Sequence, residues 1–219
     1  IMTTMAITQR LNRGLNVARH ADFLAPLLLR LFLAPVFITA GLTKLLAFES
    51  TVSWMGNPDW GLGLPLPWLM AVLATATELV GGWLLLFGLG TRLIAIPLMA
   101  TMLVAAFAVH WHNGWFAIAP SDPSTSMARP LAAIGIPTAE QSLENSEAVG
   151  ERLSAARQIL REHGNYSWLT GKGNIVILNN GIEFAATYFI MLLSLFFTGG
   201  GRYCSADYWI GRRWLNNRD

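Results

Sequence analysis

The stretch that decides the fold is Arg30–Lys44, with the sequence RLFLAPVFITAGLTK. It lies inside an apolar run from Phe23 to Phe48, whose two charged residues are Arg30 and Lys44. A helix needs about 20 apolar residues to cross a hydrocarbon core roughly 30 Å thick. The run is long enough to cross a membrane, so each of its two cations needs a partner, a cavity or an interface.

Three further apolar runs follow: Leu66–Leu89, Leu93–Trp111 and Asn174–Thr198. The chain is 53% hydrophobic and 13% charged, whereas a soluble domain carries about 25% charged residues. The runs are apolar on every face, and one soluble core cannot bury four such helices. The sequence therefore predicts an all-α polytopic membrane protein, a bundle of four transmembrane helices covering 23–111 and 174–198.

The charge and cysteine content exclude several classes of protein. A net charge of +2 is too small to attract nucleic acid. Cys204 is the single cysteine, so the chain has neither an intramolecular disulfide nor a Cys-x-x-Cys pair. Any electron transfer would need a bound cofactor, a quinone or a partner protein.

The distribution of basic residues predicts the topology. The N-terminal segment 1–22, the turn at Arg92 and the tail 199–219 are basic, whereas the connection between the first two runs carries Glu49 and Asp59 and no Lys or Arg. By the positive-inside rule, both termini are expected in the cytoplasm. The first run has the length of a full span and no cleavage site, so we expect it to remain as an uncleaved helix.

The third connection, 112–173, is longer than a four-helix bundle needs and is predicted to lie outside. Thr138 and Gln141 have the spacing of a capping box, and apolar residues then recur at helical spacing up to His163-Gly164. This pattern predicts an amphipathic helix at about 138–163. It could pack on the mouth of the bundle, lie on the lipid surface or bind a partner protein.

The ionisable residues of the first two runs are expected to lie inside the bundle. Arg30 and Lys44 share one helix face with the small residues Ala34 and Gly41. The backbones of Arg30 and Glu78 are expected at depths differing by about 7 Å, within reach of an arginine side chain, which predicts an Arg30–Glu78 pair. Glu78 and Gly82 have a spacing that permits close helix packing, and a desolvated Glu78 carboxyl could relay a proton.

Polar residues in the other two runs are candidates as well. Asn179, Glu183 and Thr187 form a polar stripe at i, i+4 and i+8. This stripe could form hydrogen bonds to neighbouring helices, or it could hold the head group of a quinone. His110 and His112 have the spacing of metal ligands but point apart on a helix, so no metal site is predicted. His110 remains a candidate for proton entry.

Three segments together resemble the DoxX family of four-helix membrane proteins: Arg30–Lys44, Glu78–Arg92 (ELVGGWLLLFGLGTR) and Gly199–Asp207 (GGGRYCSAD). The resemblance covers all four runs and the start of the tail, but not the loop 120–173. It implies a bundle in the bacterial inner membrane. A related branch, DoxD, resembles the quinone-reducing membrane subunit of thiosulfate:quinone oxidoreductase, which implies quinone chemistry.

The leading hypothesis is a quinone-interacting accessory subunit of a membrane oxidoreductase system. The alternative is a noncatalytic structural subunit that stabilises a larger membrane complex through its outer loop. A third hypothesis is a path for protons or a small solute along Arg30, Glu78 and Glu183. The expected partners are the lipid bilayer and proteins of a membrane complex, without nucleic acid. The candidate cofactor-binding residues are Arg30, Lys44, Glu78, Glu183, Asn179 and His110.

Overall fold

The computed structural model describes residues 19–120 and 122–216, and it is built from helices and loops, with no strand among these residues. The all-α prediction is confirmed. Contacts divide the chain into two compact units. Unit 1 is Ile1–Thr101 with Tyr188–Asp219, and unit 2 is Met102–Thr187. The basic residues predicted to mark the N-terminal segment lie mostly outside the described residues.

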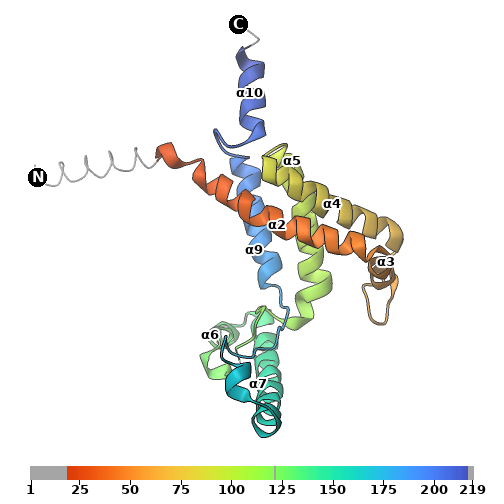
Figure 1. Ribbon diagram of the computed structural model, residues 1–219, viewed down its shortest axis with the longest axis vertical. Helices are drawn as coiled ribbons and strands as arrows, with labels where there is room; N and C mark the ends of the chain where they lie inside the picture. The colour runs from red at the N-terminus through yellow and green to blue at the C-terminus, as the bar shows by residue number, and fades with distance from the viewer. Residues whose placement is uncertain (1–18, 121, 217–219) are drawn as a thin grey trace, which may run out of the picture. The chain divides into compact units, whose positions relative to one another are not determined.

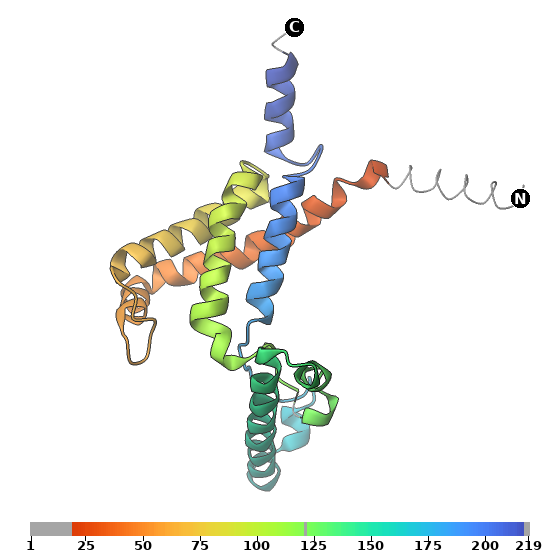
Figure 2. The same cartoon turned by 180° about the vertical axis from the view of Figure 1, so that it is seen from behind.

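Unit 1 is organised around an antiparallel pair of long helices, α2 (Leu24–Leu46) and α4 (Pro67–Phe87) (Figures 1 and 2). The short helix α3 (Phe48–Gly56) connects them and packs on α4. The first residues of α5 (Thr91–Val104), the last residues of α9 (Glu183–Thr198) and the helix α10 (Ala206–Asn216) complete the unit. A single helical turn, η1 (Arg19–Ala21), precedes α2.

Glycines allow the backbones of α2 and α4 to approach closely. A Cβ atom added to Gly41 would lie 2.7 Å from the amide nitrogen of Leu79, and one added to Gly82 would lie 2.9 Å from that of Ile38. The neighbouring Gly81 faces α5 instead, where a Cβ would lie 3.1 Å from Leu98. The expected close packing at Gly82 is therefore confirmed, because neither backbone leaves room for a side chain.

The predicted inward face of α2 is also confirmed. Arg30, Leu33, Ala34, Phe37 and Gly41 are buried, at the i, i+3, i+4, i+7 and i+11 positions of one helix face, whereas Lys44 at its end is part-exposed. The opposite side of α2 carries exposed Leu and Phe side chains, as a helix in contact with lipid would.

Three helical segments of the described chain are long and apolar enough to cross a membrane: Leu24–Leu46, Pro67–Phe87 and Thr91–Asn113. The third combines α5 with a π-helical segment η2 (Ala105–His110) and a 3-10 turn η3 (Trp111–Asn113). These segments agree with the first three predicted runs. The fourth differs, because α9 has 16 residues and begins at Glu183, whereas the predicted span begins at Asn174. The preceding backbone turns away at Asn180, whose φ is +60°, a conformation that Asn tolerates better than most residues.

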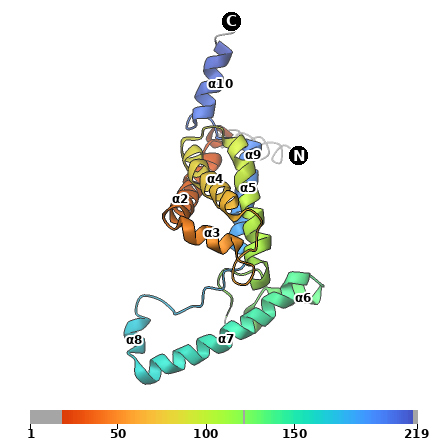
Figure 3. The same ribbon diagram turned by 90° about the vertical axis from the view of Figure 1, so that its right-hand side faces the viewer.

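Unit 2 consists mainly of a long helix, α7 (Pro137–His163), with α6 (Ala128–Ala133) near one end and α8 (Tyr166–Leu169) near the other (Figure 3). A further short turn, η4 (Pro123–Thr125), comes before α6. The bounds of α7 agree with the predicted helix to within one residue. Its buried side chains recur at helical spacing and are Ala139, Ser142, Ser146, Val149 and Leu153.

The start of α7 is not the predicted capping box. Its N-cap is Ile136, with no side-chain hydrogen bond, and Pro137 occupies the first turn, where a missing N–H costs nothing. Gln141 donates through Nε2 to the His112 carbonyl, 2.9 Å away, instead of binding the helix start. The polar side chain is thus used for a tertiary contact within unit 2.

Candidate functional site

Arg30 is the most deeply buried charge of unit 1, with 1% of its surface exposed. Its Nε donates to the Leu85 carbonyl at 2.9 Å, and Nη2 donates to Cys204 at 2.9 Å and to Leu86 at 3.3 Å. Its Nη1 donates to the Gly200 carbonyl. The predicted Arg30–Glu78 pair is wrong, because backbone carbonyls at the end of α4 and in the glycine-rich loop accept these hydrogen bonds.

The end of α4 is shaped to receive this guanidinium. The helix closes with a Schellman motif, in which Leu89 N–H donates to Leu84 and Gly88 N–H donates to Leu85. Gly88 has a φ of +64°, and a Cβ there would lie 2.5 Å from Nη1 of Arg30. Glycine is therefore required at this position for two reasons: it adopts the left-handed conformation without strain, and it leaves space for the Arg30 guanidinium.

Asp207 holds the start of α5 at the same end of unit 1, an arrangement called here the Asp207 clamp. Its carboxylate accepts hydrogen bonds from the amides of Gly90, at 2.6 Å, and Thr91, at 2.9 Å, where α5 begins. Its own N–H donates to the Gly88 carbonyl at 3.0 Å. A carboxylate at a helix N-terminus satisfies free amides and is favoured by the helix dipole. Sequence reasoning missed this role, although Asp207 ends the GGGRYCSAD segment that carried the family resemblance.

Lys44 and Glu78 form an ion pair between α2 and α4. The Lys44 Nζ donates to Glu78 Oε2 at 2.6 Å, and the two side chains are 28% and 7% exposed, respectively. Gly41, one turn before Lys44, and Gly82, one turn after Glu78, bring the two helices close enough for this contact. Two of the predicted site residues are thus brought together, in a pairing that the sequence did not predict.

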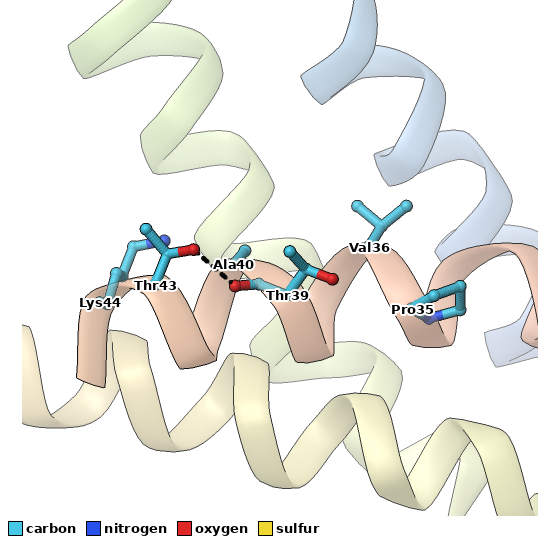
Figure 4. Close-up of a pocket in the computed structure, with 6 residues that line it drawn as sticks. All are labelled: Pro35, Val36, Thr39, Ala40, Thr43 and Lys44. Atoms are coloured by element: carbon cyan, nitrogen blue, oxygen red, sulfur yellow. Dashed lines mark hydrogen bonds between the residues drawn. The ribbon is translucent and has the colours of Figure 1, made fainter. Parts of the chain in front are cut away.

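Lys44 also lines an open groove along α2. The other lining residues are Pro35, Val36, Thr39, Ala40 and Thr43 (Figure 4). Figure 4 shows these side chains in a row on the side of α2 that faces away from α4, with Lys44 at the end of the row. The Thr43 hydroxyl donates to the Thr39 carbonyl at 2.9 Å, so the groove wall is mainly apolar with one cationic end.

Glu183 and Asn179 have a structural role within unit 2. Glu183 Oε2 accepts a hydrogen bond from the Ala117 amide at 2.9 Å, and Asn179 Nδ2 donates to the carbonyls of Asn113 and Phe116, both at 2.8 Å. Asn145 of α7 donates to Asn179 Oδ1. The predicted internal stripe on a fourth helix is wrong, because Asn179 precedes α9 and Thr187 is exposed. These polar groups instead hold the loop that follows Asn113.

His110 lies in unit 2, half-buried near the end of the third apolar segment. Its Nδ1 atom is buried and has no hydrogen-bond partner among the described residues. The described part of the chain contains no group of three or more His, Cys, Asp or Glu side chains that could hold a metal ion. Of the six predicted site residues, only Lys44 and Glu78 contact one another directly through their charged groups.

A family model and two named relatives match part of the chain. The DoxX family model matches residues 25–111, which include α2, α4 and α5. The Bacillus subtilis (strain 168) protein named "Putative oxidoreductase CatD" is 35% identical over 83 residues, 38% of this chain and 58% of the relative.

The Escherichia coli (strain K12) protein named "Inner membrane protein YphA" is 33% identical over 106 residues, 46% of this chain and 71% of the relative. The chain thus spans a little more than half of the first relative and more than two thirds of the second. No solved structure matches the chain significantly.

Proposed function

Because this chain belongs to the DoxX family of membrane proteins, we propose that it is an inner-membrane subunit that binds a quinone beside Lys44 and serves a membrane oxidoreductase. The observation that carries the proposal is the Lys44–Glu78 ion pair, which joins two candidate spans and whose Lys44 lines the groove on α2. Ionisable residues within membrane segments are costly and commonly mark functional sites. One relative is itself named as an oxidoreductase.

The groove residues have the chemistry that a quinone requires. Lys44 Nζ has three donors, and one is used by Glu78 among the described residues. A second donor is available for a carbonyl oxygen of the quinone head group. Glu78 provides a carboxylate next to the ammonium group, and this carboxylate can take up a proton. Pro35, Val36 and Ala40 offer an apolar wall for a ring.

A bound quinone would supply two-electron, two-proton chemistry that the side chains of this chain lack. The electrons would come from a partner oxidoreductase. We assign Lys44 to binding and orientation of the head group and Glu78 to the proton. Arg30, Glu183 and Asn179 fit a quinone less well, because Arg30 donates to backbone carbonyls, Glu183 Oε2 accepts the Ala117 amide, and Asn179 bonds to backbone carbonyls and to Asn145. His110 remains a candidate for proton entry.

We further propose that α9 is the fourth membrane helix. Its 16 residues are apolar in composition and make about 24 Å of helix, about 6 Å less than a hydrocarbon core roughly 30 Å thick. Arg92 and Arg202 flank the glycine-rich loop after α9, and Arg212 and Arg213 follow in α10. The positive-inside rule places this basic end, and with it the C-terminus, in the cytoplasm.

The test is quinone binding by the full chain in nanodiscs, measured by isothermal titration with a short-chain ubiquinone and a short-chain menaquinone. Loss of a hydrogen bond from a charged donor costs about 1.5–3 kcal/mol, so Lys44→Gln is expected to weaken binding by tenfold or more. Lys172→Gln, which removes a lysine from unit 2, is the matched control and is expected to leave affinity unchanged. Equal quinone affinity in the Lys44→Gln and wild-type proteins would overturn the proposal.

A second candidate function is a structural subunit of a membrane complex. It is favoured by exposed apolar side chains around α6 in unit 2, namely Met127, Leu131, Ile134 and Ile136. Contiguous exposed apolar surface commonly marks a protein interface. Leu131→Glu with Ile134→Glu is expected to release a partner that co-purifies from native membrane, while quinone affinity stays unchanged. A partner retained by this variant would contradict an interface at α6.

A further inference from the structure

The helix α10 carries large apolar side chains that the described residues of unit 1 leave exposed. Trp209, Ile210 and Trp214 are 52%, 47% and 68% exposed. Figures 1 and 2 show α10 extending from the end of unit 1 where α5 begins, with no other helix alongside it. Exposed apolar area of this kind on a short helix needs an occupant.

The side chains of α10 are sorted onto two faces. At 100° per residue, Ile210, Gly211 and Trp214 share one side of the helix. A Cβ added to Gly211 would meet no atom of the described residues within 4 Å, so they leave this apolar face open. Arg213 borders this face next to Ile210, whereas Arg212 and Trp209 lie on the opposite side of the helix, where the Arg212 guanidinium is 5.9 Å from the Trp209 ring centre. Aromatic and basic residues on one short amphipathic helix are typical of helices at a membrane interface.

The start of α10 is fixed at the end of a candidate membrane span. The Asp207 carboxylate binds the amide of Thr91, the first residue of the span Thr91–Asn113. Ser205 Oγ accepts a hydrogen bond from the Tyr208 amide at 3.2 Å, which holds the first turn. If α5 crosses the bilayer, the first turn of α10 must lie at the level of the lipid head groups.

We propose that α10 binds the surface of an anionic phospholipid bilayer, with Ile210 and Trp214 in the interfacial region and Arg212 and Arg213 on head-group phosphates. The charge complementarity favours lipid over an apolar protein partner, since each basic residue near an anionic membrane contributes about 1 kcal/mol of attraction. Arg92 and Arg202 line a groove at the base of α10 and add basic side chains at the same level, although Arg202 also pairs with Asp22. Tryptophan is enriched at this depth of a bilayer.

The experiment places a nitroxide label on the open face of α10. Gly211→Cys, in a Cys204→Ser background, puts the label where a side chain meets no neighbour. The full chain is reconstituted in nanodiscs of phosphatidylcholine alone or with phosphatidylglycerol. Electron paramagnetic resonance then measures the label's accessibility to oxygen and to a water-soluble nickel chelate. A label at the exposed position Glu151 of α7, introduced as Glu151→Cys, is the control.

We expect phosphatidylglycerol to protect the Gly211 label from the nickel chelate and to leave the Glu151 label unchanged. Arg212→Gln with Arg213→Gln should lower the ratio of bound to free α10 about 30-fold, whereas Arg212→Lys with Arg213→Lys should keep most of it. Both arginines are exposed, so these changes should not affect folding.

Two results would overturn the proposal. One is equal exposure of the Gly211 label in both lipid compositions. The other is protection in detergent that rises with protein concentration, because that pattern identifies a second copy of the chain as the occupant. Quinone affinity is measured on the same samples. The outcome for α10 is therefore separate from the outcome for Lys44.

Discussion

The two cationic side chains of α2 differ in what satisfies them. Arg30 is buried and donates to backbone carbonyls from the end of α4 and the glycine-rich loop. Lys44, about four turns later, is part-exposed and donates to the side chain of Glu78. A cation held by backbone is fixed by the fold, whereas a cation held by another side chain can exchange its partner. The position of Arg30 is therefore structural, whereas the hydrogen bond of Lys44 to Glu78 can be exchanged for another.

The largest expected effect is that of Arg30→Met. Removing the guanidinium takes a donor from the carbonyls of Leu86, Gly200 and Cys204, whereas Leu85 keeps the N–H of Gly88. Each carbonyl left without a donor costs about 1–3 kcal/mol. We expect the free energy of unfolding, measured by steric trapping in micelles, to fall by about 3 kcal/mol or more. Arg30→Lys should recover only part of it, because an ammonium group lacks the planar fork. Arg152→Met, a change at an exposed arginine, is the control. If Arg30→Met is as stable as Arg152→Met, Arg30 does not have the structural role that distinguishes it from Lys44.

Asp207→Ala is expected to have the next largest effect. It removes the acceptor for the amides of Gly90 and Thr91, and loss of such a helix cap costs about 1–2 kcal/mol. Hydrogen exchange at these two amides should become faster, while amides of unit 2 keep their rates. Asp59→Ala, in the exposed loop before α4, should leave both rates unchanged. Unchanged exchange at Gly90 and Thr91 in Asp207→Ala would show that the clamp is unnecessary.

Glu183→Gln tests whether charge matters in unit 2 as it does at Arg30. The amide oxygen of Gln can still accept the Ala117 hydrogen bond, so we expect a loss of about 1 kcal/mol or less, the difference between a charged and a neutral acceptor. Exchange of the Ala117 amide should rise modestly. A loss as large as that of Arg30→Met would instead indicate that Glu183 has a further partner of opposite charge.

The smallest net effect on stability is expected for the double substitution Lys44→Met with Glu78→Leu. Replacing both members of an ion pair with apolar residues of similar size is often neutral, whereas removing one member leaves an unpaired charge. Glu78→Leu alone should therefore destabilise unit 1, and adding Lys44→Met should restore stability. No second substitution can compensate Arg30→Met in this way, because its partners are backbone atoms. A double variant less stable than Glu78→Leu would contradict the distinction between a cation bound by backbone and one bound by another side chain.

The amino-acid sequence was sufficient to predict the membrane class, the three long apolar helices, the inward face of α2 and the helix at 138–163. These features depend on residue type and periodicity, which are local properties. The close approach at Gly82 was predicted for the same reason, since a residue without a side chain permits contact whatever its neighbour is.

Only the tertiary structure decided which polar group meets which. Arg30 has several carbonyls within reach and Glu78 has two cations on the facing helix, so the pairing depends on how far α2 slides and rotates against α4. The start of α9 was likewise decided by long-range contacts, because the amides of Asn179 and Asn180 donate to the Ala117 carbonyl instead of continuing a helix. Burial and periodicity are encoded residue by residue, whereas hydrogen-bond partners are fixed by the geometry of segments far apart in the chain.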